Sequence, residues 1–237
     1  ANIAFIKYWG NRDDNLRLPV NGSISMNLEG MDTVTKVTFD PRQDVDVLIL
    51  NGSPQEGGQL ARVSRFLDHV RAISGRESRA RVESANNFPM GAGIASSASA
   101  FAALSAAAAT AAGLELAPSA CSRLARLGSG SASRSVPGGF VEWKKGRGDQ
   151  DSWAFSIAPA DHWDLVDWIV VVSREHKKVG SSQGHTLAST SPLQQARVLD
   201  APRRLDVCRA AVQERDFERL ADIVEQDSHM MHAVMMT

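Results

Sequence analysis

The sequence has few cysteines and almost no net charge. Two cysteines among 237 residues are too few for a disulfide framework and are typical of a reducing, cytoplasmic compartment. Lysine and arginine number 26 against 27 aspartates and glutamates. This balance argues against a surface dedicated to nucleic acid or to an anionic membrane. No basic segment followed by an apolar run marks a signal peptide.

One long stretch, residues 84–114, contains no charged side chain, and its length would suffice to cross a bilayer. Its composition does not fit that role, because alanine, serine and threonine dominate and Pro89, Gly91 and Gly93 interrupt its first third. Ten of the fifteen residues in Ala98–Ala112 are alanine, which favours a closely packed helix in a soluble protein. We therefore expect no membrane partner.

Hydrophobic periodicity predicts a mixture of strands and helices. Strands are expected at 1–6, 24–28, 34–39, 79–84, 139–143 and 153–157, with a hairpin loop between the last two. Helices are expected at 58–73, 98–112, 193–214 and 216–236, and a buried strand at 167–172. Because strands and helices do not alternate regularly, the pattern favours an α+β protein of two parts, residues 1–162 and 163–237.

The segment Pro89–Ser99 places small residues directly before the alanine-rich helix. Gly91 and Gly93 let the backbone approach a ligand, and the unpaired N–H groups and dipole of a helix start favour an anion such as a nucleotide phosphate. The hydroxyls of Ser96 and Ser97 add hydrogen bonds or reach a metal ion. A plain glycine-rich turn with a serine cap is the alternative.

Three further segments combine charged, hydroxyl and glycine residues. Lys7–Asp13 follows the first strand, and Glu175–His185 is basic and interrupted by glycine. In Gly128–Ser135, four hydroxyls surround one guanidinium, which suits a phosphate or carboxylate because arginine donates two parallel hydrogen bonds. The plainer alternatives are a solvated strand end for the first segment and polar loops for the other two.

Together these segments resemble the diphosphomevalonate decarboxylases, within the small-molecule kinase superfamily that includes galactokinase, homoserine kinase and mevalonate kinase. The resemblance covers essentially the whole chain. It is carried by Ala1-Asn2-Ile3-Ala4, Lys7-Tyr8-Trp9-Gly10, Asn21-Gly22-Ser23-Ile24-Ser25, Asn86–Pro89, the Gly91–Ser99 loop, Gly128–Arg134 and Asp227-Ser228. It implies an N-terminal nucleotide-binding domain with the ribosomal-protein-S5-domain-2-like fold and an incomplete, ferredoxin-like C-terminal domain.

The family uses ATP to phosphorylate the tertiary 3-hydroxyl of a 5-phosphorylated mevalonate, and phosphate and CO2 then leave to give an isoprenoid building block. The resemblance implies ATP and Mg²⁺ as cofactors and a cytoplasmic homodimer. ATP is then expected at Pro89, Gly91, Ala92, Gly93, Ala95, Ser96, Ser97 and Ser99, with Ser97 also near the metal. The substrate is expected at Tyr8, Asn11, Ser129, Ser131, Arg134 and Ser182. Lys7 would support charge at the site of phosphoryl transfer.

The sequence departs from the family pattern at Asn11, where the family usually has lysine. A neutral side chain there penalises a diphosphate more than a monophosphate. A phosphomevalonate decarboxylase that makes isopentenyl phosphate is therefore one alternative, unless Lys177 or Lys178 supplies the missing charge.

The second departure is an absence. The family's Asp-x-Gly-Pro-Asn-like segment carries the aspartate that acts on the 3-hydroxyl, and no such segment occurs in the 237 residues. Asp227 belongs to the earlier Asp-Ser motif and does not replace it. The chain also opens within a strand and without an initiator methionine. We therefore expect a truncated chain that lacks full activity.

Three other functions are alternatives. The first is a kinase of the same superfamily that stops at the phosphorylated product, which release of CO2 would distinguish. The second is a nucleic-acid-binding module, since the N-terminal fold is shared with a ribosomal-protein domain. The balanced charge and the lack of a basic stripe with stacking aromatics argue against it. The third is a catalytically inactive binding protein.

Overall fold

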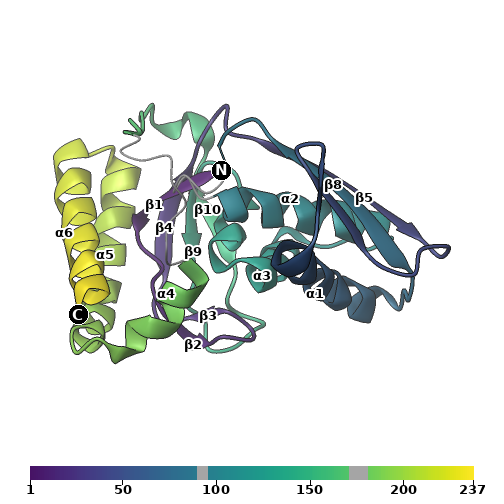
Figure 1. Cartoon of the computed structure of the whole chain (residues 1–237). Helices are drawn as coiled ribbons and strands as arrows, with labels where there is room; N and C mark the ends of the chain where they lie inside the picture. The colour runs from purple at the N-terminus through teal and green to yellow at the C-terminus, as the bar shows by residue number, and fades with distance from the viewer. Residues whose placement is uncertain (90–95, 171–180) are drawn as a thin grey trace.

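The computed structural model describes residues 1–89, 96–170 and 181–237, the last range with side chains from residue 184 onward. Its strands form two four-stranded sheets and one short two-stranded ribbon. Two helices, α5 (Gln194–Glu214) and α6 (Phe217–Met236), cover the outer face of the first sheet. Helices α1 (Gly57–Ser74), α2 (Ser96–Ala111) and α3 (Pro118–Gly128) lie between the two sheets, and α1 and α2 pack on the second (Figure 1). The mixed α+β fold expected from the sequence is confirmed.

The first sheet is antiparallel, with β1 (Asn2–Ile6), β4 (Ser23–Asn27), β9 (Phe140–Trp143) and β10 (Ala154–Ala158) in that spatial order. Helices α5 (Gln194–Glu214) and α6 (Phe217–Met236) pack side by side against one face (Figure 1). This interface buries apolar residues of both layers, among them Ile6, Ile24, Phe140, Cys208, Val212 and Ile223. The opposite face carries Tyr8, Val141, Trp143 and Ala154.

The second sheet has the order β5 (Thr33–Asp40), β8 (Arg79–Asn86), β6 (Val47–Leu50) and β7 (Ser53–Gln55). Strands β6 and β8 are parallel, because helix α1 (Gly57–Ser74) carries the chain back across the sheet between them. Helix α2 (Ser96–Ala111) packs on β5, and its small alanine side chains let the helix approach the strand closely.

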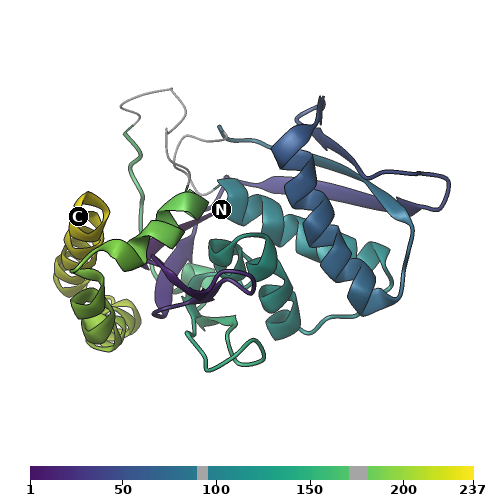
Figure 2. The same ribbon diagram turned by 60° about the horizontal axis from the view of Figure 1, so that its bottom comes forward.

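The inner face of the first sheet meets α3 (Pro118–Gly128) and the 3-10 helix η1 (Gly130–Ser135). The ribbon of β2 (Asn11–Asp13) and β3 (Leu18–Pro19) continues from β1. Helix α4 (Ser181–Leu187) lies beside this ribbon in both views (Figures 1 and 2). Two further 3-10 turns, η2 (Ala160–His162) and η3 (Ala188–Thr190), complete the described elements.

The strongly periodic segments are confirmed to within two residues, including all four predicted helices and the β9–β10 hairpin. Helix α3 was not predicted, although Pro118 at its start is a recognised beginning for a helix. Asn51 and Gly52 form a turn, and the following Ser53 and Pro54 belong to β7. None of the helices in the described ranges is long and apolar enough to span a membrane.

The predicted strand at 167–172 is wrong over its described part. Residues 163–170 have no regular secondary structure, and Trp168 is 88% exposed. A strand requires a neighbour that takes up its main-chain hydrogen bonds, and none of the described strands pairs with this segment. Apolar, β-branched residues therefore did not suffice to form a strand here. Residues 171–172 lie outside the described residues.

Candidate active site

A cavity of about 570 Å³ lies between the second sheet and helices α1 and α2. Pro89, Ser96 and Ser97, three of the expected ATP-binding residues, line it beside apolar residues of β6, β8 and α2. Ser97 is exposed at the first turn of α2. The remaining loop residues predicted here, Gly91, Ala92, Gly93 and Ala95, lie outside the described residues.

Arg62 is the charged residue among the described side chains that line this cavity, and it belongs to none of the sequence motifs. Its guanidinium stacks over the Phe101 ring at 4.7 Å, and its Nη2 donates to the Gly128 carbonyl at 2.8 Å. Burial, aided by Arg17 and Arg65, lowers its pKa to about 10. The cavity therefore holds a cation that has no carboxylate partner among the described contacts.

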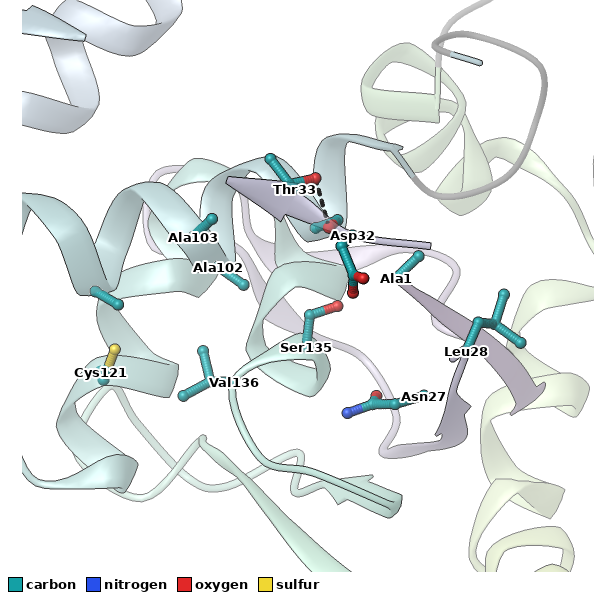
Figure 3. Close-up of a pocket in the computed structure, with 12 residues that line it drawn as sticks. Ala1, Asn27, Leu28, Asp32, Thr33, Ala102, Ala103, Cys121, Ser135 and Val136 are labelled. Atoms are coloured by element: carbon teal, nitrogen blue, oxygen red, sulfur yellow. Dashed lines mark hydrogen bonds between the residues drawn. The ribbon is translucent and has the colours of Figure 1, made fainter. Parts of the chain in front are cut away.

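Ser99, the last of the expected ATP-binding residues, faces away from this cavity. Its hydroxyl lies 2.7 Å from that of Thr33. Both residues line a different cavity of about 380 Å³, which Asp32, Ser135 and Cys121 also border (Figure 3). The structure thus places Ser96 and Ser97 together and separates them from Ser99.

Arg134, in η1, is the most buried cation of the predicted substrate site, with only 2% of its surface exposed. It donates from Nη1 to the hydroxyl of Ser23 and lies over the Trp143 ring. Burial lowers its pKa to about 10. Its contacts among the described residues include no carboxylate, so the positive charge is left for an anion to neutralise.

Tyr8 is held beside the Arg134 guanidinium by an aromatic cluster. Its ring meets Trp143 edge-on at 4.8 Å and stacks on His185 at 4.0 Å. A Cβ atom on Gly130 would come within 2.5 Å of the Tyr8 ring, so the glycine allows η1 to approach. The Tyr8 hydroxyl donates to Asn11 Oδ1, and burial raises its pKa to about 12. Tyr8 therefore stays protonated at neutral pH.

A row of three hydroxyls connects the 570 Å³ cavity with the residues expected to bind the substrate. Ser97 Oγ lies 3.4 Å from Ser129 Oγ, which in turn lies 3.4 Å from Ser131 Oγ. The segment that carries Ser129 and Ser131 is a helix end followed by η1, not the flexible polar loop of the plainer interpretation. The two expected binding regions are thus adjacent.

Lys7 completes the cluster from the end of β1. Its Nζ donates to the Ala4 carbonyl at 2.7 Å. Burial lowers the pKa of Lys7, an effect that the nearby Asp227 carboxylate partly offsets. Ser182 belongs to α4, where the structure describes its backbone only. Its expected contact with the substrate stays a prediction.

His185, the last residue of the segment Glu175–His185, lies in helix α4 and packs beside Tyr8. Its Nδ1 accepts a hydrogen bond from the Gly10 amide at 3.0 Å, and its ring lies between Tyr8 and Trp9. Burial lowers its pKa to about 4, with Arg17 adding to the effect. His185 is therefore a neutral packing and acceptor residue at physiological pH.

This pKa predicts an acid-sensitive fold. The unfolded chain binds a proton at His185 near pH 6.5, whereas the folded protein excludes it until about pH 4. The contribution of the neutral His185 to the free energy of unfolding is therefore fully present above pH 6.5 and is lost as the pH falls towards 4. In urea titrations at pH 7.5 and 5.0, the wild type should lose about 2 kcal/mol more of its unfolding free energy than His185→Gln. Equal losses in the two proteins would contradict the prediction.

The fold and the site together define a class: α+β proteins in which a cavity between a sheet and two helices adjoins a cluster of buried cationic and hydroxyl side chains. Two family models match the chain. The diphosphomevalonate decarboxylase-like N-terminal domain matches residues 1–154, and the mevalonate 5-diphosphate decarboxylase C-terminal domain matches residues 168–237. The chain therefore belongs to the diphosphomevalonate decarboxylase family.

Individual relatives agree with this assignment. The diphosphomevalonate decarboxylase of Ganoderma lucidum is 42% identical over 99% of the chain and 63% of its own length, and that of Homo sapiens is 38% identical over 98% and 62%. The chain thus spans less than two thirds of the length of these relatives.

Solved structures agree as well. The mevalonate diphosphate decarboxylase structure from Staphylococcus aureus is 41% identical, with a TM-score of 0.89 over 99% of this chain and 71% of that one. A structure of MDDEF in complex with MVAPP, AMPPCP and magnesium has the same TM-score at 38% identity, over 99% of this chain and 72% of that one.

Proposed function

We propose that these residues form the ATP- and substrate-binding part of a diphosphomevalonate decarboxylase, which makes isopentenyl diphosphate with ADP, phosphate and CO2. The observation that carries the proposal is Arg134, a buried cation without a described carboxylate partner, in the same 3-10 helix as Ser131, whose hydroxyl is connected through Ser129 to Ser97 at the 570 Å³ cavity. The complex of MDDEF with MVAPP, AMPPCP and magnesium supports the same pair of ligands for this chain.

The residues present fit a magnesium nucleotide. The Arg62 guanidinium can neutralise phosphate charge, and the exposed Ser97 hydroxyl is the kind of oxygen ligand that Mg²⁺ accepts. ATP, when bound, supplies the phosphoryl group that turns the 3-hydroxyl of the substrate into a better leaving group. The protein's own residues bind and orient the two ligands.

On the substrate side, five side chains suit an anionic, phosphorylated molecule. Arg134 offers a fixed guanidinium, and Ser129 and Ser131 present hydroxyls that reach towards Ser97. Tyr8 remains a neutral hydroxyl donor because its pKa is raised to about 12. Lys7 adds a cation at the end of β1, where charge develops during phosphoryl transfer.

One observation favours phosphomevalonate as a second candidate substrate. Asn11 accepts from Tyr8 at Oδ1 and donates from Nδ2 to the Asp14 carboxylate at 2.7 Å. Both ends of this amide are engaged, and Asp14 brings negative charge to the position where the family usually has lysine. A second phosphate near Asn11 would therefore gain less than it does beside a cation.

Three finer features remain proposals from the family resemblance. They are a homodimeric assembly, a cytoplasmic location, and the absence of the family's catalytic aspartate from these 237 residues. The division into parts at residue 162 also stays a prediction.

Calorimetric titration of the chain with mevalonate diphosphate and with phosphomevalonate, combined with an assay for CO2, tests the proposal. We expect at least one of the two compounds to bind with a stoichiometry of one, and ATP-dependent release of CO2 to be slow or absent. Binding of neither compound would overturn the proposed function. Rapid release of CO2 would instead overturn the proposed absence of the catalytic aspartate.

A further inference from the structure

The main chain of Lys7–Gly10, the segment that presents Lys7 and Tyr8 to the site, is held by side chains from the last third of the chain. The Lys7 amide donates to Asp227 Oδ2 at 2.7 Å, and the Lys7 carbonyl accepts from Arg197 Nη2 at 2.8 Å. The Trp9 carbonyl accepts from Gln194 Nε2 at 2.9 Å and from Arg197 Nη1 at 3.3 Å.

Two of these side chains, Arg197 and Asp227, interact with each other and with Arg204 through buried charges. Arg204 Nε donates to Asp227 Oδ1 at 2.9 Å, and Arg197 Nη2 lies 3.9 Å from the same oxygen. Arg204 Nη2 also donates to the Arg197 carbonyl at 2.9 Å. Asp227 and Arg204 are completely buried, and Arg197 is 1% exposed. We refer to Arg197, Arg204 and Asp227 as the buried charge cluster.

Apolar packing that does not include the buried charge cluster attaches the helices to the sheet. An apolar interface that includes Ile6, Ile24, Cys208 and Val212 already joins α5 and α6 to β1 and β4. Buried ion pairs are costly to desolvate and add little net stability, so their value lies in fixing one conformation. In this protein, the hydrogen bonds of the cluster end on the backbone of the substrate-binding segment.

We propose that Arg197 and Asp227 are positioning residues that fix the backbone of Lys7–Gly10 and thereby preorganise Tyr8 and Lys7 for the anionic substrate. Arg204 orients both of them. The inference rests on the proposed substrate-binding role of this segment. It further implies that nucleotide affinity is independent of the cluster, because Arg62 and Ser97, which line the nucleotide cavity, belong to α1 and α2.

The test compares Arg197→Lys and Asp227→Asn with Arg203→Lys as the matched control. Arg203 lies on the same helix but is half-exposed, and its contacts with Asp200 and Gln226 are at the surface. Calorimetry would measure the Kd of mevalonate diphosphate and of AMPPCP with Mg²⁺. Hydrogen exchange would report on the amides of Lys7 and Gly10. Gln194→Leu, which removes one donor to the Trp9 carbonyl, provides a milder variant should the charged ones fail to fold.

We expect the Kd of mevalonate diphosphate to rise at least about tenfold in both cluster variants, with faster exchange at Lys7 and an AMPPCP Kd within about twofold of the wild type. The control should match the wild type in all three measurements. An unchanged Kd for mevalonate diphosphate, or an equal loss for the two ligands, would overturn the inference. Failure of the wild type to bind mevalonate diphosphate would instead contradict the proposed function.

Discussion

Arg134→Met is expected to weaken the binding of mevalonate diphosphate at least about 100-fold without destabilising the protein. The wild-type guanidinium is buried, its pKa is lowered to about 10, and its described contacts include no carboxylate. Folding therefore includes the free-energy cost of desolvating this charge. A bound anion offsets that cost by pairing with the guanidinium. Methionine fills a similar volume without charge, so the free energy of unfolding should stay unchanged or rise by about 1–3 kcal/mol.

Arg126→Met is the matched control, because Arg126 is an equally buried arginine with a structural set of partners. It forms an ion pair with Asp149 and donates to the carbonyls of Leu16 and Ser152. Its replacement leaves these acceptors without a donor and should cost at least about 2 kcal/mol of unfolding free energy. Urea denaturation and calorimetry on both variants test the contrast. A large loss of stability in Arg134→Met would mean that Arg134 is a structural residue.

Arg62→Met is expected to raise the Kd of ATP with Mg²⁺ at least about tenfold, with little effect on mevalonate diphosphate. Among the described residues that line the nucleotide cavity, Arg62 alone is charged, and burial has already lowered its pKa to about 10. A polyphosphate in this cavity would therefore gain most of its local neutralisation from this side chain.

Arg65→Met, one turn further along α1, is the control for this prediction. Arg65 is exposed and does not line the cavity, although its charge acts on Arg62. Its replacement should leave the Kd of ATP within about twofold of the wild type. Equal effects of the two replacements would show that α1 contributes only a general positive field. Titration of each variant with AMPPCP and Mg²⁺ separates the two outcomes.

Hydrophobic periodicity predicted the secondary structure correctly where the residues of a segment favour one conformation by themselves. The helices at 58–73 and 98–112 are observed as Gly57–Ser74 and Ser96–Ala111, because their apolar residues and alanines favour helix regardless of distant partners. The segment 167–170 shows the opposite case. Its apolar residues were typical of a buried strand, but strand formation depends on a neighbour that the sequence cannot locate.

The candidate site divides in the same way. Tyr8, Ser129 and Arg134 were found through two short motifs, Lys7–Asp13 and Gly128–Ser135, which the structure brings together. Arg62 and Arg197 carry no such signal. Arg197 reaches a carbonyl 190 positions earlier in the chain. Such contacts depend on how α5 and α6 pack on the first sheet, which no local pattern encodes.

Above all, we propose that the cavity lined by Ser97 and the adjacent substrate residues, connected by the hydroxyls of Ser97, Ser129 and Ser131, hold a nucleotide and an anionic substrate at the same time. Calorimetric titration of mevalonate diphosphate into the chain saturated with AMPPCP and Mg²⁺ tests it most directly. We predict one substrate per chain, bound at least as tightly as without nucleotide. Displacement of one ligand by the other, or failure of either to bind, would contradict it.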